Sequence, residues 1–267
     1  MKIPIFQIDA FSGKVFAGNP AAVCPLDSWL GDELMQAIAA ENNLAETAFF
    51  VRAGVGYDIR WFTPATEVEL CGHATLAAAH VLFTDIELGR RAVTFASKSG
   101  PLTVTKDDDL LCLDFPARPP QPVDDASLLG EFERIFSARP QEILKAVEYL
   151  AVFDDPQRVR ALAPDLAGIE EVARRGKCHG IIASAADTDA DFISRFFAPL
   201  AGIPEDPVTG STHCTLVPYW AKKLGKQSLR AFQASPRGGE LFCEDCGDRV
   251  LIAGRTAQYM RGEIELP

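Results

Sequence analysis

The sequence has no apolar run that approaches the roughly 18–20 residues of a membrane-spanning helix. It also has no excess of positive charge, since 26 Lys and Arg residues stand against 37 Asp and Glu residues and leave a formal net charge of −11. Nonspecific binding to nucleic acid or to an anionic membrane needs basic patches, so neither partner is expected. The first residues, MKIPIFQIDAF, alternate like a strand and lack the apolar core and cleavage site of a signal peptide. We therefore expect a cytoplasmic protein.

Cysteine is scattered along the chain rather than arranged in a framework. The seven cysteines form an odd set, which is typical of reduced thiols in a cytosolic protein. Cys243 and Cys246 form a lone C-x-x-C in a polar turn, and no second ligand pair at a standard spacing accompanies it. We accordingly expect no metal ion.

Proline is concentrated at one place, where Pro116, Pro119, Pro120 and Pro122 fall within seven residues. Such a stretch cannot continue a helix or lie centrally in a sheet, so it predicts a stiff connector near the middle of the chain. The prediction is an N-terminal lobe of residues 1–117, completed by a C-terminal strand at about 256–267, and a C-terminal lobe of residues 118–255.

Short β-like runs dominate the first half of the chain, interrupted by one amphipathic helix between Leu30 and Glu41 that Asp27 or Ser28 could cap. The predicted strands of this half are 3–8, 48–51, 57–62, 93–96, 102–105 and 110–115. In the second half we expect helices around 140–150 and 156–174 and strands near 180–183, 191–197, 249–253 and 256–265. Because strands and helices do not alternate regularly, the pattern predicts an α+β fold.

Two runs of fifteen uncharged residues, Leu70–Thr84 and Pro207–Ala221, stand out in a chain of which 24% is charged. A helix built from the first run is apolar or small on every side, so other elements must enclose it. Pro218 could kink or delay a helix in the second run.

A short motif precedes both runs, because Arg60-Trp-Phe-Thr-Pro64 matches Arg195-Phe-Phe-Ala-Pro199. The simplest account is an internal duplication, in which each lobe wraps a curved sheet around one buried helix. Chance similarity of two short aromatic strands is the alternative.

Glycine and polar side chains gather where the two uncharged runs begin, at Gly72 and Gly210. The N-terminus of a helix presents unpaired N–H groups and a partial positive charge, which suits a carboxylate or another small anion, and glycine lets the backbone approach it closely. His73 follows the first glycine, where the helix dipole disfavours a charged imidazole. Asp206 and Ser211 flank the second glycine.

Glu46 lies in NNLAETAFF, between the amphipathic helix and an apolar strand, where partial burial suits a carboxyl group that carries protons. Each of these residues also has a plain structural interpretation. His73 and Ser211 could cap helices, Asp206 could be an ordinary turn residue, and Glu46 could be a solvated strand start. Taken together, the four residues favour a catalytic site.

Five ordered motifs carry a family resemblance along nearly the whole chain. They are DAFSGKVFAGNPAAV (9–23), NNLAETAFF (42–50), RWFTPATEVELCGHAT (60–75), EDPVTGSTHC (205–214) and RGGEL (237–241). These motifs resemble the PhzF family, the phenazine-biosynthesis isomerase and its many homologues. The resemblance implies a fold like that of diaminopimelate epimerase: two pseudo-symmetric lobes, each a barrel-like, mostly antiparallel sheet around a central helix, with the site in the cleft between them.

The resemblance also implies proton transfer at carbon without a cofactor. Glu46 matches the family's catalytic glutamate, which takes a proton from one carbon and returns it to another. His73, Asp206 and Ser211 match residues that hold the substrate and assist the proton's movement.

Substrate binding is assigned in the same way. Gly72 and Gly210 would receive the substrate carboxylate, and Cys71 and Arg237 are expected among the substrate-binding residues. The family's best-known reaction isomerises a dihydro-hydroxyanthranilate, a cyclic amino acid. We therefore expect a small carboxylate-bearing substrate, no cofactor, and a possible homodimer.

Two rival functions stay open at this point. An amino-acid epimerase or racemase of the related kind uses two opposed cysteines, and Cys71 occupies the first of those places. The second helix start, Val208-Thr209-Gly210-Ser211, has no thiol, and Cys214 is expected to face the core. The other rival is a homologue that binds a small metabolite without catalysis.

Overall fold

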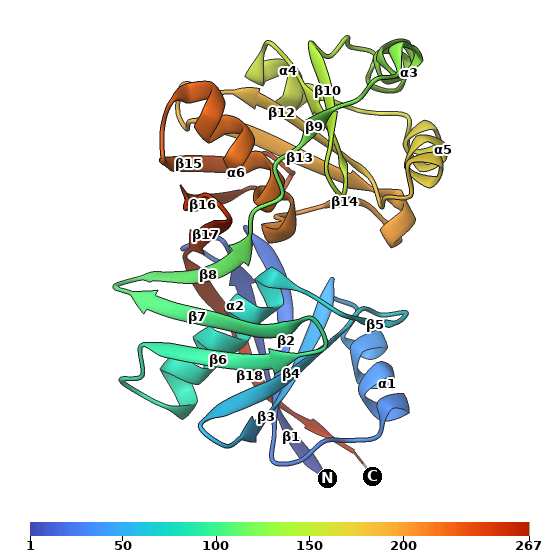
Figure 1. The fold of residues 1–267 in the computed structure, drawn as a ribbon. Coiled ribbons are helices and arrows are strands. Elements are labelled where there is room, and N and C mark those ends of the chain that lie inside the picture. Colours follow the sequence, from blue (N-terminus) through green and yellow to red (C-terminus); the bar gives the residue numbers. More distant parts are fainter. Residues whose placement is uncertain (267) are drawn as a thin grey trace. The chain divides into compact units, whose positions relative to one another are not determined.

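The structure is a computed structural model that describes residues 1–266, so Pro267, the last residue of the predicted C-terminal strand, lies outside the described residues. The chain divides into two compact units (Figure 1). Unit 1 consists of Met1–Phe115 and the chain from Ile252 onward, and unit 2 consists of Pro116–Leu251. The predicted boundaries at 117 and 255 lie slightly further along the chain than these.

Unit 1 is a mixed, mostly antiparallel sheet. Its strands are β1 (Lys2–Ala10), β2 (Asn19–Leu26), β3 (Glu46–Ala53), β4 (Gly56–Phe62), β5 (Glu67–Val68), β6 (Ala92–Ser97), β7 (Gly100–Asp107), β8 (Leu110–Pro116) and β18 (Thr256–Glu265). The pairs β1–β18, β1–β2, β3–β4, β4–β5, β6–β7 and β7–β8 are antiparallel, and β2–β3 and β4–β6 are parallel. All six strands predicted for the first half fall within these elements.

The uncharged run of unit 1 forms α2 (Gly72–Val81), which continues into a π-helical turn at Leu82–Ile86. The helix contacts β1, β2, β3, β7 and β18, and all of its residues except the first and His80 are buried. The prediction that other elements enclose this helix is therefore confirmed.

The amphipathic helix α1 (Asp32–Asn42) buries Met35, Ile38 and Ala39 against the sheet. The helix begins at Asp32, not at Leu30 as predicted. Gly31 occupies the N-cap position in place of Asp27 or Ser28, and no side chain caps the helix.

Unit 2 repeats the strand order of unit 1. Its elements are β9 (Gln121–Pro122), α3 (Ala126–Phe136), β10 (Glu142–Lys145), β11 (Tyr149–Val152), α4 (Pro156–Ala161), α5 (Leu166–Gly176), β12 (Ile181–Ala186), β13 (Phe192–Ala198), β14 (Ile203–Asp206), α6 (Gly210–Leu224), β15 (Ser228–Gln233) and β16 (Gly239–Asp245). The strand β17 (Arg249–Gly254) begins in unit 2 and ends in unit 1. The pairs β10–β11, β12–β13, β13–β14 and β15–β16 are antiparallel, and β11–β12 and β13–β15 are parallel.

The two lists of pairings correspond strand by strand. β1 to β4 match β10 to β13, β5 matches β14, α2 matches α6, and β6 and β7 match β15 and β16, with the same parallel or antiparallel sense in every pair. Two unrelated short motifs would not give this agreement over six pairings. The structure therefore supports internal duplication over chance similarity.

Unit 2 differs from its prediction at three helices. Residues 140–150, expected as a helix, form the strands β10 and β11, because both find partners in the sheet of unit 2. The helix that packs there is α3, whose Phe132 and Ile135 are buried. The helix expected over 156–174 is two helices, α4 and α5, separated at Pro164. Finally, α6 runs through Pro218 without ending.

Candidate active site

Unit 1 brings three of the predicted residues together. Glu46 is the first residue of β3, Cys71 is the N-cap residue of α2, and His73 lies in the first turn of that helix. The Glu46 side chain is 19% exposed and that of His73 is 7% exposed, so both lie at a largely buried position. Because β3 and α2 contact each other, the strand start and the helix start lie side by side.

The distances within this group are those of direct polar contact. His73 Nε2 lies 3.0 Å from Glu46 Oε2. Cys71 Sγ lies 3.5 Å from His73 Nδ1 and 4.0 Å from its Nε2. We call these three residues the acid–base group, because they place a carboxylate, an imidazole and a thiol within proton-transfer range.

The charge on His73 is set by its neighbours rather than by the helix. Burial lowers the pKa of His73, but its interactions with Cys71 and Glu46 raise it by more, so the pKa lies well above the ordinary 6.5. Burial also raises the pKa of Cys71 to about 11. The sequence argument, which weighed only the helix dipole, predicted the opposite direction. A full charge 3.0 Å away outweighs a partial charge.

Two further residues orient the group. Asn19 is fully buried at the start of β2, and its Nδ2 lies 3.3 Å from His73 Nδ1. Thr75 donates from both its backbone N–H and its hydroxyl to the carbonyl of Cys71, which fixes the N-cap backbone. Asn19 therefore lies beside Nδ1, and Nε2 is the ring nitrogen that contacts Glu46. Asn19 carried no role in the sequence argument, although it lies in the first family motif.

The same three residues could also hold a metal ion. Each offers one ligand atom, and these atoms all lie within 4.8 Å of one another. A thiolate, an imidazole nitrogen and a carboxylate oxygen are all established ligands of zinc.

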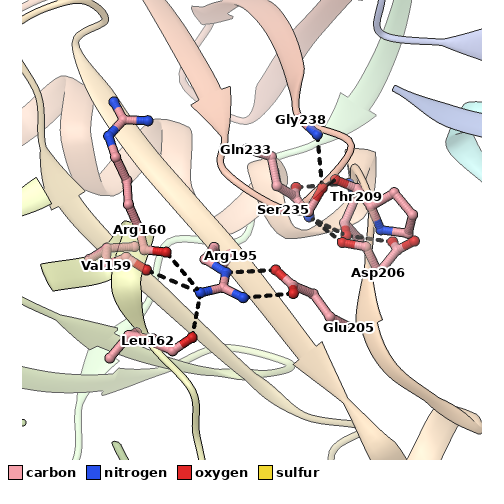
Figure 2. Close-up of polar contacts among 11 residues, drawn as sticks. Val159, Arg160, Leu162, Arg195, Glu205, Asp206, Thr209, Gln233, Ser235 and Gly238 are labelled. Carbon is pink, nitrogen blue, oxygen red and sulfur yellow. Dashed lines mark hydrogen bonds and ion pairs between the residues drawn. The ribbon is translucent and has the colours of Figure 1, made fainter. Parts of the chain in front are cut away.

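Unit 2 holds its predicted residues in a different network, which Figure 2 shows. Asp206 ends β14, and its Oδ2 accepts a hydrogen bond from the hydroxyl of Thr209, the N-cap residue of α6. Gln233 is fully buried and joins the two: its Nε2 donates to the Asp206 carbonyl and to Thr209 Oγ1, and its Oε1 accepts from Thr209 N–H. This network holds the turn that leads to Gly210.

A second loop lies against that turn. Ser235 Oγ donates to the carbonyl of Pro207 and accepts from the N–H of Gly238, which has a φ of +65° that favours glycine. Arg237 lies between them in the same loop and is half-buried. Ser211 follows Gly210 on α6 and is exposed. Neither Ser211 nor His73 caps its helix, so the plain capping interpretation of both is wrong.

Matching ion pairs precede the two helices. Arg60 on β4 donates through Nε and one terminal nitrogen to both oxygens of Glu67, and Arg195 on β13 does the same to Glu205. Each glutamate lies five residues before its helix glycine. The pairs tie the chain segment entering each helix to the neighbouring strand.

The structure thus joins Glu46, Cys71 and His73 within unit 1, with Gly72 opening the helix between the last two. Within unit 2 it places Asp206 beside the turn to Gly210. Sequence reasoning missed Thr209 and Gln233. The register of a parallel pair, β13 with β15, brings Gln233 to the turn, and no local pattern signals this.

No helix among residues 1–266 is both long and apolar enough to cross a membrane.

The chain is similar to known proteins over nearly its full length. The profile of the PhzC-PhzF family, described as phenazine biosynthesis-like protein, matches residues 8–262. An uncharacterized isomerase of Pseudomonas aeruginosa is 48% identical, with 100% of both chains covered. The crystal structure of a PhzF-family phenazine biosynthesis protein of Enterococcus faecalis superposes with a TM-score of 0.95 at 42% identity, again over 100% of both chains.

A more distant structure bears on the fold alone. A hydroxyproline epimerase of Agrobacterium vitis has a TM-score of 0.62 at 10% identity, and the match covers 98% of this chain and 92% of that one. The predicted α+β fold of the epimerase type is confirmed. The relatives also bear out an isomerase rather than a homologue that only binds. The chain belongs to the PhzC-PhzF family of phenazine biosynthesis-like proteins.

Proposed function

We propose that the protein is a cofactor-independent isomerase that moves a proton between two carbons of a small carboxylate-bearing metabolite, with Glu46 as the group that carries the proton. The observation that supports this most is the contact of 3.0 Å between Glu46 Oε2 and His73 Nε2 at a largely buried position. A carboxylate held in one place by an imidazole, with little water around it, is the arrangement that general acid–base catalysis needs.

The reaction balances without any other reactant. Glu46 takes a proton from a carbon next to a double bond, and the electron pair of the broken C–H bond forms a double bond to the neighbouring carbon. The π electrons of the original double bond then form a new C–H bond at its far carbon, with the proton that Glu46 returns. No electron leaves or enters the substrate, so the product is an isomer. His73 stabilises the ionised state of Glu46 before the first step and after the second.

The substrate's carboxylate belongs to the same proposal. Gly72 opens α2 beside Glu46 and His73, and the first backbone N–H groups of a helix have no partner within it. A carboxylate bound there is stabilised by hydrogen bonds and by the positive end of the helix dipole. A compact amino-acid-like molecule, cyclic or open, is held by its carboxylate in this arrangement while a nearby carbon meets Glu46.

By family resemblance, Asp206 and Ser211 hold the substrate and assist the movement of the proton, whereas Gly210 and Arg237 bind the substrate. These roles stay predictions, which single substitutions test through their effect on KM and kcat. The homodimer and the cytoplasmic location also stay predictions, and analytical ultracentrifugation tests the first of them.

The decisive experiment follows the proton. Candidate small carboxylates are first screened for thermal stabilisation of the protein, which reports binding to the folded state. Any binder is then incubated in deuterated solvent, in the presence of a metal chelator, and label at carbon is followed by NMR. Glu46→Gln should reduce exchange at least ~100-fold, the scale of general acid–base catalysis, while the ligand still stabilises the protein. Glu41→Gln, an exposed change on α1, is the matched control. Exchange that survives Glu46→Gln removes Glu46 from the mechanism.

The racemase alternative rests on Cys71, whose Sγ contacts His73. Two observations weigh against it. Burial raises the pKa of Cys71 to about 11, and the corresponding residue of unit 2 is Thr209, whose hydroxyl donates to Asp206. Inactivation by a thiol reagent with protection by substrate would favour the racemase, whereas an active Cys71→Ala variant would reject it.

A further inference from the structure

We propose that Glu46, Cys71 and His73 form a binding site for one divalent ion of the zinc type. The group combines a carboxylate oxygen, a thiol sulfur and an imidazole nitrogen from two elements that contact each other, β3 and α2. Zinc sites with three protein ligands keep the fourth position for water or another small ligand.

The geometry is close to what a tetrahedral ion requires. Bonds of about 2.0–2.3 Å to zinc hold neighbouring ligand atoms roughly 3.3–3.8 Å apart. In this structure the Nε2–Oε2 distance is 3.0 Å and the Sγ–Nε2 distance is 4.0 Å, one slightly shorter and one slightly longer than that range. The third separation, between the Cys71 sulfur and a Glu46 carboxylate oxygen, is at most 4.8 Å, so the ligand atoms draw together around an ion by rotation about the side-chain bonds.

Two neighbouring residues can orient the ligands. A ligating histidine usually donates its second ring N–H to an acceptor, and the Asn19 side-chain amide lies 3.3 Å from Nδ1 of His73, where it must turn to present its oxygen when Nε2 binds the ion. Thr75 fixes the backbone that carries Cys71. The N-terminus of α2 opposes a bare cation but stabilises a thiolate, and a thiolate with a carboxylate neutralises the two positive charges of the ion.

The C-x-x-C pair is the competing place for such an ion. Cys243 is buried on β16 and Cys246 follows the strand on the exposed side, so the pair offers two thiols, against three ligands of three kinds in the acid–base group. Cys246 is therefore the control position for any metal-binding measurement.

Occupancy of the site has a consequence for catalysis. The ion takes the carboxylate oxygen and the imidazole nitrogen that the proposed reaction uses, so zinc is expected to inhibit the enzyme reversibly. This consequence rests on the proposed function, but the binding does not, because it needs neither substrate nor turnover.

Cobalt is the probe, because Co²⁺ occupies zinc sites and a bound thiolate gives it a charge-transfer absorption band. The reduced full-length protein is titrated with Co²⁺ under anaerobic conditions. We expect the band to saturate at one equivalent, to disappear on addition of Zn²⁺, and to be lost in Cys71→Ser but retained in Cys246→Ser. Glu46→Gln should keep the band and weaken Co²⁺ affinity at least ~10-fold, since it removes a ligand.

Three results would overturn the site: no band in the wild-type protein, a band that depends on Cys246 and survives Cys71→Ser, or an unchanged affinity in Glu46→Gln. Circular dichroism checks that Cys71→Ser is folded. If this variant is unfolded, the Co²⁺ affinity of Glu46→Gln alone tests the site. The label-exchange experiment runs with a chelator present, so a failed metal site leaves the proposed function standing, and a failed exchange leaves the metal site standing.

Discussion

Units 1 and 2 have the same strand order but different side chains at matching positions. Thr47 pairs with Phe62 in unit 1, and Ile181 pairs with Phe197 in unit 2, so the position of Glu46 corresponds to Gly180. A Cβ at Gly180 would lie 1.9 Å from the carbonyl oxygen of Phe197, so no larger residue fits there. Unit 2 therefore has no room for a carboxylate at the place where unit 1 keeps one.

The helix starts differ in the same way. The N-cap residue is Cys71 in unit 1 and Thr209 in unit 2, and the residue after the helix glycine is His73 in one and Ser211 in the other. Unit 1 thus holds three ionisable side chains, Glu46, Cys71 and His73. Unit 2 holds groups that mainly donate and accept hydrogen bonds, locked by Gln233. A duplicated backbone preserves the position of a site, whereas its chemistry depends on a few side chains.

The largest difference we expect concerns the two arginine–glutamate pairs. Besides Glu205, the guanidinium of Arg195 donates to three carbonyls near the end of α4, those of Val159, Arg160 and Leu162 (Figure 2). Arg195→Met removes this donor from all three carbonyls and leaves the largely buried Glu205 without its cationic partner, so it should lower the free energy of unfolding by about 3–5 kcal/mol.

The matched change in unit 1 is expected to be mild. Arg60→Met leaves Glu67 paired with Lys98, so it should cost about 1 kcal/mol or less. Urea denaturation of both variants measures the contrast. Equal losses would mean that the two pairs contribute alike and that the extra carbonyl contacts of Arg195 are unimportant.

A smaller effect distinguishes the units by pH. Thr75 in α2 and His213 in α6 occupy matching positions, and each hydrogen-bonds the carbonyl of its N-cap residue. Burial lowers the pKa of His213 to about 4. In the unfolded chain His213 takes up a proton below about pH 6.5, whereas in the folded chain it does so only below about pH 4. The free energy of unfolding therefore falls as the pH falls through this window, by up to about 3 kcal/mol.

His213→Asn keeps a donor for the Thr209 carbonyl and removes the titration. We expect its stability to change less than that of the wild type between pH 6.5 and 4, measured by urea denaturation at several pH values. His179→Asn, at an exposed histidine, is the control and should follow the wild type. Parallel curves for His213→Asn and the wild type would contradict the assignment.

The smallest effect concerns the matching threonine itself. Thr75→Val keeps the shape of a fully buried side chain and removes its hydroxyl hydrogen bond to Cys71. The Cys71 carbonyl keeps the backbone N–H of residue 75 as a donor, so the loss should be about 1 kcal/mol and independent of pH. A pH-dependent loss in this variant would show that the acid–base group, rather than the helix start, responds to the change.

Much of unit 1 could be predicted because its signals are local. The alternating runs became strands, and the uncharged run became a helix that other elements enclose. In unit 2, residues 140–150 have an apolar pattern that fits a helix, yet they form β10 and β11. Strand pairing with β12 decided this, and such a partner, about thirty residues away, leaves no trace in the local pattern.

The sequence by itself indicated two long uncharged runs at matching places and singled out Glu46, His73 and Cys71 as candidates, because composition, spacing and family motifs carry that information directly. Only the tertiary structure decided that these three side chains touch, that Asn19 and Gln233 hold the two helix starts, and that His73 is favoured in its charged form. Each of these depends on strand register and on burial, and both arise from contacts between residues far apart in the chain.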